Sequence, residues 1–316
     1  MLRFLLWVIA TVLGLLAVLV LIGGVYFWQA SKGENPDHLE ALYVTERDVF
    51  MDIAGARVRV RREGAASNPP LILIHGFTLS LESWDSWSDL LQEEYHVIRY
   101  DLLGHGLTGP DRQRRYSAPE RAEFLEALMD ELGIERATLA GNSLGGQIAW
   151  LFAASHPDRV ERMVLVSAGG FSINNVEDEP VAPPLIARAY FLLAPEPLIE
   201  QAARFVYADP SRLTENRLTV VRDMMRREGN GQAFIDQINE FTLPDPTEAL
   251  STINTPTLVL WGARDATLPL DHARRFHAAL PNAELEIFDD LGHAPQEEAP
   301  VETAMAIREF LSSPAD

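Results

Sequence analysis

A serine on a predicted sharp turn between a strand and a helix constrains this chain more than any other feature of its sequence. The segment Gly141-Asn142-Ser143-Leu144-Gly145 follows the short apolar run 137–140 and precedes a stretch with helical character. The small residues two positions before and after Ser143 allow a turn tight enough to expose the hydroxyl above a sheet edge. The alternative is a small residue at a helix start, but the strand-turn-helix context favours a nucleophile.

Two later segments supply partners for this serine in the expected order. Asp265 follows the predicted strand 257–261, and His293 follows the predicted strand 284–288. Because the carboxyl ends of parallel strands lie at one edge of a sheet, both side chains are expected to emerge near Ser143. A serine hydroxyl needs a base and a group that fixes the base's tautomer, so we predict His293 and Asp265 in these roles.

Other acidic residues and histidines compete for the same roles. Asp271 could replace Asp265, but its position at a helix start is better explained by capping. The acidic pair at 289–290 could orient His293 locally, although acidic pairs in loops usually face water. His75, which closes a predicted buried strand, is expected to hold the adjacent loop through its ring nitrogens and not to act as a base.

We predict neither a metal nor a cofactor. Asp101 and His105 lie in a Gly-rich turn after a strand, where Asp101 is expected to accept backbone N–H groups. A metal site is the alternative there, but no paired-ligand spacing such as H-E-x-x-H is present. Cysteine is absent and Lys32 is the one lysine, so thiolate and Schiff-base chemistry have no candidate in the body of the chain.

A hydrolytic serine also needs donors for the oxyanion of a tetrahedral intermediate. The backbone N–H of Leu144, at the predicted helix start, is one candidate. The backbone N–H of Phe77, in the loop after the predicted strand 71–74, is the other. These two residues complete the predicted site.

The pattern along the chain predicts an α/β fold with a doubly wound, mostly parallel sheet. Apolar runs typical of strands alternate with helical patterns such as 119–132 and 147–154, and an antiparallel edge hairpin turns around Gly55. Between residues 172 and 248 the alternation stops and a proline-punctuated helical region replaces it, which we interpret as an inserted cap. The predicted strands are 49–53, 58–60, 71–74, 96–100, 137–140, 163–167, 257–261 and 284–288, and the predicted domains are 1–32 (anchor), 33–171 and 249–316 (core) and 172–248 (cap).

The first residues form a long apolar run without charge. From Phe4 to Trp28 only one threonine and three glycines interrupt it, enough for a helix to span a bilayer at 1.5 Å per residue. A cleaved signal peptide is the alternative, but bulky Trp28 stands where small residues would be expected. We therefore predict a single-pass membrane anchor. The charge of Arg3 and the amino terminus, set against the mixed flank 32–37, favours an extracytoplasmic body.

Composition narrows the range of partners. The chain has 316 residues, 47% of them hydrophobic, and a formal net charge of −20. An acidic chain without a basic cluster is not expected to bind nucleic acid. The expected partners are a small hydrophobic ester and, through the anchor, a membrane, while the oligomeric state is left open.

Together these motifs carry a family resemblance. The combination resembles the α/β-hydrolase fold superfamily from about residue 49 onward, and within it lipases and esterases with a membrane-anchored amino terminus, including monoacylglycerol lipases. It is also similar to carbon-carbon bond hydrolases, which often place Asn before the serine, as Asn142 does here. The segments that carry the resemblance are 75–77, 101–106, 141–146, 262–265 and 292–293.

The resemblance implies a serine hydrolase that cleaves a carboxylic ester. The segment Phe77-Thr78-Leu79-Ser80 replaces the Gly-Pro-Gly-type loop of many carbon-carbon hydrolases and favours the esterase. The alternatives are hydrolysis of a carbon-carbon bond in a vinylogous diketone, for which Arg188, Arg204 or Arg222 could bind a substrate carboxylate, and a non-catalytic binding protein. Candidates for an apolar acyl pocket in the cap are Leu185, Tyr190, Phe191, Phe205, Met224, Met225 and Phe234.

Overall fold

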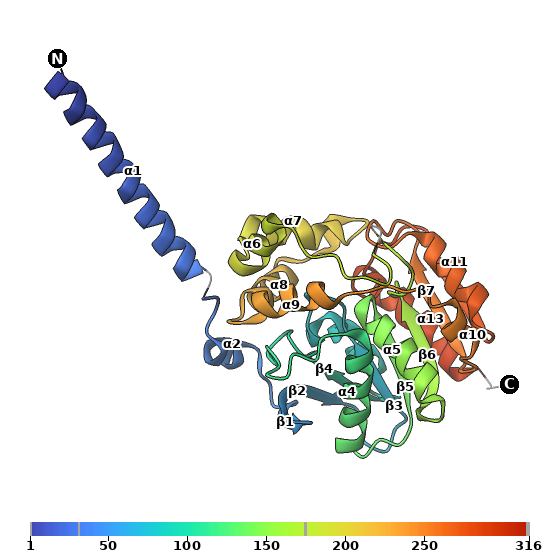
Figure 1. Cartoon of the computed structure of the whole chain (residues 1–316). Helices are drawn as coiled ribbons and strands as arrows, with labels where there is room; N and C mark the ends of the chain where they lie inside the picture. The colour runs from blue at the N-terminus through green and yellow to red at the C-terminus, as the bar shows by residue number, and fades with distance from the viewer. Residues whose placement is uncertain (1, 31, 174–175, 314–316) are drawn as a thin grey trace.

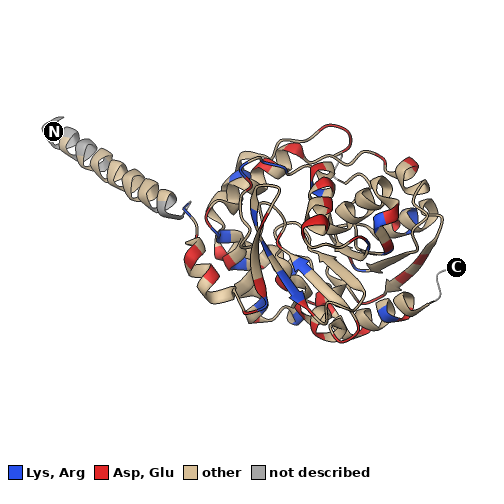
Figure 2. Cartoon of the chain, turned by 90° about the horizontal axis from the view of Figure 1, so that it is seen from below, with Lys and Arg blue, Asp and Glu red and all other residues tan. Residues whose placement is uncertain are grey.

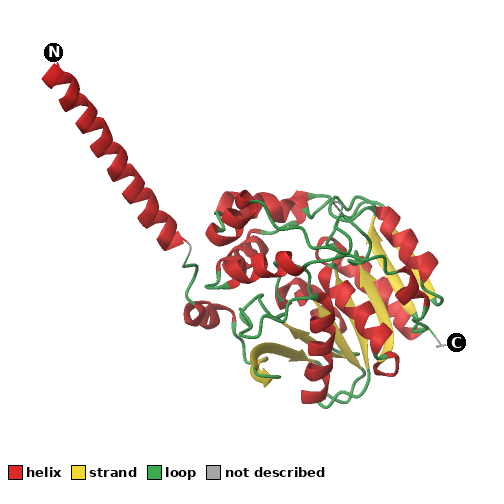
Figure 3. Cartoon of the chain, viewed as in Figure 1, coloured by secondary structure: helices red, strands yellow, loops and turns green. Residues whose placement is uncertain are grey.

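A twisted sheet forms the centre of the molecule, and helices cover both of its faces (Figures 1 and 3). The computed structural model describes residues 2–30, 32–173 and 176–313. In these residues the eight strands are ordered β1-β2-β4-β3-β5-β6-β7-β8. They span Asp48–Ile53 (β1), Ala56–Glu63 (β2), Pro70–Ile74 (β3), His96–Tyr100 (β4), Ala137–Asn142 (β5), Val160–Val166 (β6), Thr257–Gly262 (β7) and Ala283–Phe288 (β8).

Only the β1 edge of the sheet is antiparallel. β1 pairs antiparallel with β2, and β2 with β4, whereas every pair from β4 to β8 is parallel. The predicted edge hairpin and the mostly parallel sheet are therefore confirmed. Since the parallel strands run the same way, the loops after β3, β5, β7 and β8 gather at one edge.

The alternation of side chains along the strands divides the core into two layers. Ile72 and Ile74 of β3 face one layer, and Leu71 and Leu73 face the other, all fully buried. The first layer is closed by α4 (Ala118–Glu131), α5 (Leu144–Ser155) and α11 (Leu270–Ala279). The second layer is closed by α3 (Asp85–Leu91) and α13 (Pro300–Ser312).

Helices between β6 and β7 lie over the carboxyl edge of the sheet (Figure 1). They are α6 (Leu185–Leu193), α7 (Glu196–Phe205), α8 (Glu215–Arg226) and α9 (Asn230–Glu240), whereas the short α10 (Thr247–Ser251) packs beside α5 and α11 in the first layer. Ile199, Val221 and Phe234 form a small core of their own, against which Phe77 and Leu79 from the loop after β3 pack. We keep the name cap for this segment, and its limits at 172 and 248 stay a prediction.

The first helix, α1 (Leu2–Ala30), stands away from the body (Figure 1). Its described side chains are Trp7, Thr11, those of residues 13–25, and Trp28. Within the described part of the chain, no helix was found that is both long enough and apolar enough to cross a membrane.

The residues that follow α1 attach the start of the chain to the cap. The N–H of Glu34 donates to the carbonyl of Arg226 at 2.6 Å, and the Glu34 carbonyl accepts the N–H of Glu228 at 2.9 Å. Helix α2 (Pro36–Tyr43) continues this attachment, since the Tyr43 hydroxyl lies 2.5 Å from the Asp223 carboxylate on α8. Residues 34–43 therefore attach to α8, the helix that contributes part of the cavity wall described below.

The apolar packing of α2 against the body of the protein is expected to contribute to the free energy of unfolding. Leu39 is 1% exposed and packs against Leu107 and Met224. Leu39→Ala should lower the free energy of unfolding by about 2–5 kcal/mol, because it removes buried methyl groups and leaves a cavity. The matched change Leu42→Ala, at a residue 57% exposed on the same helix, should stay within about 0.5 kcal/mol of the parent. Urea unfolding measures both, and equal losses would contradict the assigned packing.

Candidate active site

Ser143 occupies a strained turn between β5 and α5. Its backbone has φ +53° and ψ −114°, which non-glycine residues rarely adopt. The turn is possible because the residues two positions before and after the serine are glycines, so that the backbone can lie directly against neighbouring backbone. A Cβ at Gly145 would overlap the carbonyl of Ile74, and one at Gly141 would overlap the carbonyl of Gly145. The sharp turn predicted from the sequence is therefore present.

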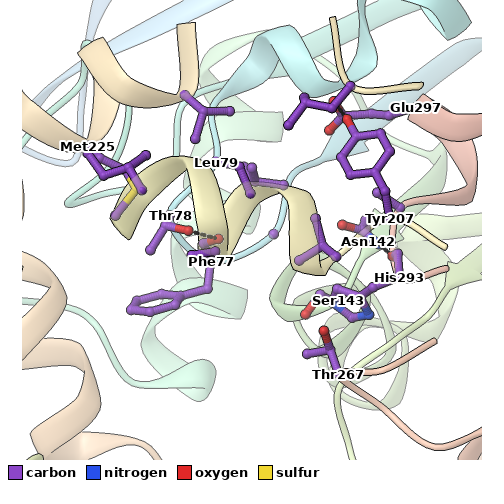
Figure 4. Close-up of a pocket in the computed structure, with 18 of the residues that line it drawn as sticks. Phe77, Thr78, Leu79, Asn142, Ser143, Tyr207, Met225, Thr267, His293 and Glu297 are labelled. Carbon is purple, nitrogen blue, oxygen red and sulfur yellow. Dashed lines mark hydrogen bonds between the residues drawn. The ribbon is translucent and has the colours of Figure 1, made fainter. Parts of the chain in front are cut away.

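The structure brings His293 and Asp265 into direct contact. His293 Nδ1 lies 2.8 Å from Asp265 Oδ2. The other oxygen of Asp265 accepts the backbone N–H groups of Thr267 and Leu268, each at 2.8 Å, and the carboxylate is fully buried. A carboxylate held in this way keeps the proton of a neutral imidazole on Nδ1 and leaves Nε2 free to accept one. Ser143 and His293 line the same cavity and lie next to one another in Figure 4.

The competing acids lie elsewhere. Asp271 is in the first turn of α11, where a carboxylate is stabilised by the helix dipole, but the residue at the N-cap is Pro269. The expectation that Asp271 caps this helix is therefore wrong. Asp290 forms an exposed ion pair with Arg264.

The two predicted oxyanion donors lie beside the serine. Leu144 is the first residue of α5, so its N–H has no partner within the helix. Phe77 follows β3, and a Cβ at the neighbouring Gly76 would lie 3.3 Å from the Ser143 Cβ, which shows how closely the two loops approach. Phe77 and Ser143 line the same cavity walls.

Buried polar residues hold the loop that carries Phe77. His75 Nε2 accepts the N–H of Leu102 at 3.0 Å, so its proton is on Nδ1, which donates to the Gly76 carbonyl at 2.8 Å. Asp101 accepts the N–H groups of Leu81 at 2.9 Å and Leu107 at 2.7 Å. The expected structural roles of His75 and Asp101 are confirmed.

Burial alters the acidity of these groups. It lowers the pKa of His75 to about 3, because the charged ring would lose its solvation. Burial also raises the pKa of Asp101 to about 6, although the Arg59 guanidinium acts in the opposite direction. His105 is likewise buried and its pKa is lowered. In the described residues, no group of three or more His, Asp or Glu side chains is arranged to hold a metal ion.

Asn142 links the nucleophile turn to the histidine loop, a role that the sequence did not suggest. Its side-chain amide donates to the carbonyl of Val166 at 3.1 Å and to that of His293 at 3.0 Å. The residue before the serine therefore restrains the backbone of the base.

A second set of contacts joins the histidine loop to the cap. The N–H of His293 donates to the Val206 carbonyl at 2.8 Å. Glu298, in α12 (Pro295–Glu298), accepts the N–H of Gly292 at 2.6 Å through one oxygen and that of Ala208 at 2.9 Å through the other. Burial raises the pKa of Glu298, while these N–H groups oppose the shift.

The neighbouring carboxylate of Glu297 completes the junction. It accepts two hydrogen bonds from the Arg217 guanidinium, at 2.5 and 3.1 Å, and one from the Tyr207 hydroxyl at 2.8 Å. Because Arg217 and Glu297 are 80 residues apart in the chain, no local sequence pattern could have paired them.

The cavity in front of Ser143 has a volume of about 280 Å³ and a mostly apolar wall. Of the residues predicted to line an apolar pocket, Tyr190, Phe191 and Met225 do so. The prediction is wrong for Leu185 and Phe205, which are 82% and 60% exposed, and for two residues that pack in buried clusters, Met224 and Phe234.

The three candidate arginines do not line this cavity. Arg204 pairs with Glu200 and Glu215, and Arg222 pairs with Glu196. Arg188 is on α6 and does not contribute to the wall either. The arginine that does line it is Arg217.

Comparisons with known proteins agree with this architecture. The family model of the alpha/beta hydrolase fold matches residues 69–300, so the chain belongs to the α/β-hydrolase family. An uncharacterized protein of Mycobacterium tuberculosis is 31% identical over 84% of this chain and 81% of its own length. A 2-hydroxy-6-oxononadienedioate/2-hydroxy-6-oxononatrienedioate hydrolase of Paraburkholderia phymatum is 30% identical over 87% of this chain and 97% of its own length.

A solved structure shows a similar arrangement along nearly the whole chain. The crystal structure of a membrane phospholipase A, described as a bacterial virulence factor, has a TM-score of 0.72 at 26% identity and covers 98% of both chains. With the family established, the chain is a hydrolase of the α/β fold.

The structure also suggests how the buried histidine affects stability. Unfolded, His75 binds a proton below about pH 6.5, whereas in the folded protein its pKa is about 3. Acidification from pH 7.5 to 5.5 therefore favours the unfolded chain, by about 1.4 kcal/mol from this residue. In His75→Gln the fall in unfolding free energy between these pH values should be smaller by that amount. Urea unfolding at both pH values tests this, and the same fall in parent and variant would contradict it.

Proposed function

We propose that this hydrolase cleaves a carboxylic ester with Ser143 as nucleophile, His293 as base and Asp265 as its partner. The observation that carries the proposal is the 2.8 Å contact between His293 and Asp265, at the wall of the cavity that contains the strained serine. An imidazole with Nδ1 bound to a buried carboxylate has the tautomer that can deprotonate a hydroxyl.

In the first half of the reaction, Ser143 Oγ attacks the ester carbonyl while His293 Nε2 takes its proton. The backbone N–H groups of Phe77 and Leu144 stabilise the oxyanion, and Asp265 stabilises the imidazolium. The carbon–oxygen bond to the alcohol then breaks, and His293 returns the proton to the departing oxygen. In the second half, His293 takes a proton from a water molecule, which attacks the acyl carbon. The bond to Ser143 Oγ then breaks, the acid leaves, and His293 returns the proton to Oγ.

The cavity wall supports a hydrophobic substrate. Phe191, Val221 and Met225 are among the side chains that surround the space in front of Ser143. Removing an alkyl chain from water is favourable by about 0.8 kcal/mol per methylene group, so such a wall binds esters that carry an alkyl group better than those with only small polar groups.

Carbon-carbon bond hydrolysis is the second candidate, because a relative with 30% identity is named as such a hydrolase. A substrate carboxylate would require a cation in the cavity. Arg217 lines the wall, but its guanidinium already binds both oxygens of Glu297. This neutralised pair favours the ester. Product analysis on a vinylogous diketone and on an ester with the same alkyl group separates the two.

The triad has a direct chemical test. A fluorophosphonate should label the parent protein at Ser143, whereas Ser143→Ala should remain unlabelled and hydrolyse no p-nitrophenyl ester. Asp265→Asn should lower kcat by about 10⁴-fold, because the wrong imidazole tautomer then faces the serine. Asp271→Asn, an exposed acid of the same region, should keep parental activity. Absence of labelling in the parent would exclude the hydrolase mechanism and favour a binding protein.

We also propose that residues 1–32 anchor the protein in a membrane as a single span, with the body extracytoplasmic. The sequence supports this, since the run from Phe4 to Trp28 is apolar and uncharged. Figure 2 shows no charged residue along the described part of α1. A similar structure, that of a membrane phospholipase A, covers 98% of this chain.

Fractionation of cells tests the anchor. The full chain should sediment with membranes and resist extraction by high salt or carbonate, whereas a chain that begins at residue 33 should be recovered in the supernatant. An alkaline phosphatase joined after residue 32 should be active, because it would lie outside the cytoplasm, and the same enzyme joined before residue 1 should be inactive. The reverse pattern would contradict the proposed topology.

A further inference from the structure

Two cavities meet at the proposed nucleophile. One is the cavity described above, which we name the His293 chamber, and the other has a volume of about 450 Å³ and is named the Phe241 chamber. Phe77, Ser143 and Thr267 belong to the walls of both. The serine therefore stands at the junction of two separate spaces, as the two groups on either side of an ester carbonyl require.

The position of the base distinguishes the two chambers. His293 contributes to the wall of the first chamber and not to that of the second. When the carbon–oxygen bond breaks, the departing oxygen takes the bonding electrons and must receive its proton from His293. The alcohol therefore has to lie on the side of His293, while the acyl chain leaves the carbonyl in another direction. Leu144, a proposed oxyanion donor, borders the Phe241 chamber.

We infer that the acyl chain occupies the Phe241 chamber and the alcohol occupies the His293 chamber, so that the substrate is an ester with a sizeable group on each side. This inference rests on the proposed function and adds the direction in which the substrate lies. It concerns a reaction in which the bond from the acyl carbon to Ser143 forms, the bond to the alcohol oxygen breaks, and the proton first taken from the serine ends on that oxygen.

The Phe241 chamber suits an alkyl chain. Its volume falls within the usual range for ligand sites, about 300–1,000 Å³, and its wall is predominantly apolar. Each additional methylene group buried there should raise kcat/KM by about fourfold until the chamber is full. Besides Phe77 and Leu144, the apolar side chains of its wall include Ile173, Val176, Ile238, Phe241, Leu243 and Leu268.

The His293 chamber suits an uncharged alcohol that has an apolar chain and a further polar group, because its wall is mostly apolar but includes a few polar side chains. Tyr207, Arg217 and Glu297 contribute to its wall, and the guanidinium and carboxylate neutralise one another. Arg217 Nη1 is buried and has no hydrogen-bond partner among the described residues. An alkyl alcohol with one further hydroxyl group presents an oxygen that accepts from this guanidinium, without bringing a charge that the chamber would have to balance.

Two variants that fill one chamber each test the assignment. Ile238→Trp, on α9, narrows the Phe241 chamber, and Ala203→Phe, on α7, narrows the His293 chamber. Acyl selectivity is the ratio of kcat/KM for p-nitrophenyl dodecanoate to that for p-nitrophenyl acetate. Alcohol selectivity is the ratio of kcat/KM for octyl acetate to kcat/KM for ethyl acetate. Ile238→Trp should lower the acyl ratio at least tenfold and the alcohol ratio less than twofold, and Ala203→Phe should do the opposite.

Two control variants introduce the same side chains, Trp and Phe, at positions outside the chambers. Glu240→Trp and Gln201→Phe change exposed positions on the same two helices and should alter neither ratio. The exchanged pattern, or equal changes in both ratios for both chamber variants, would overturn the assignment. Labelling of Ser143 by diisopropyl fluorophosphate separates this failure from that of the proposed function. Labelled variants without the expected selectivity refute the chambers alone, whereas an unlabelled parent refutes the mechanism itself.

Should Ile238→Trp fail to fold, a variant that enlarges the Phe241 chamber replaces it. Phe241→Ala should move the preferred p-nitrophenyl ester to a longer acyl chain and leave the alcohol ratio unchanged. A shift in the alcohol ratio instead would refute the assignment.

Discussion

The close approach of α5 to the end of β3 is the constraint on which the rest of the site depends. Gly145 lies against the Ile74 carbonyl, where no side chain fits. This contact brings the start of α5 beside the loop that carries Phe77 and leaves Ser143 with a positive φ. Such a conformation costs about 1–3 kcal/mol and persists only because the surrounding sheet leaves no alternative.

Hydrogen bonds from buried side chains to backbone groups then position the loops around the serine. His75 and Asp101 hold the loop after β3, whereas Asn142 and Glu298 hold the loop that contains His293. These bonds join segments far apart in sequence, so the geometry of the site depends on the packing of the whole sheet. Because Glu298 also binds the segment after α7, the base and the cap are held by one carboxylate.

Much of the architecture could be predicted from local patterns. The strand at 71–74 is apolar throughout, as a strand buried on both faces requires, and the order of Ser143, Asp265 and His293 predicted a common sheet edge. The cap was less predictable. Helical periodicity marks which residues are apolar but not whether they face the cavity, so Phe205 was predicted to line it and is exposed. Arg217 was overlooked because only the fold pairs it with Glu297.

The sequence by itself determined the order of strands and helices and the place of the nucleophile turn, since these depend on residues within a few positions of one another. Only the tertiary structure decided which other distant groups meet: Arg217 with Glu297, Asn142 with the histidine loop, and the two cavities with Ser143 between them. Cavities and buried polar contacts are formed by side chains from separate elements. Their positions follow from how the layers pack and are not encoded in any single segment.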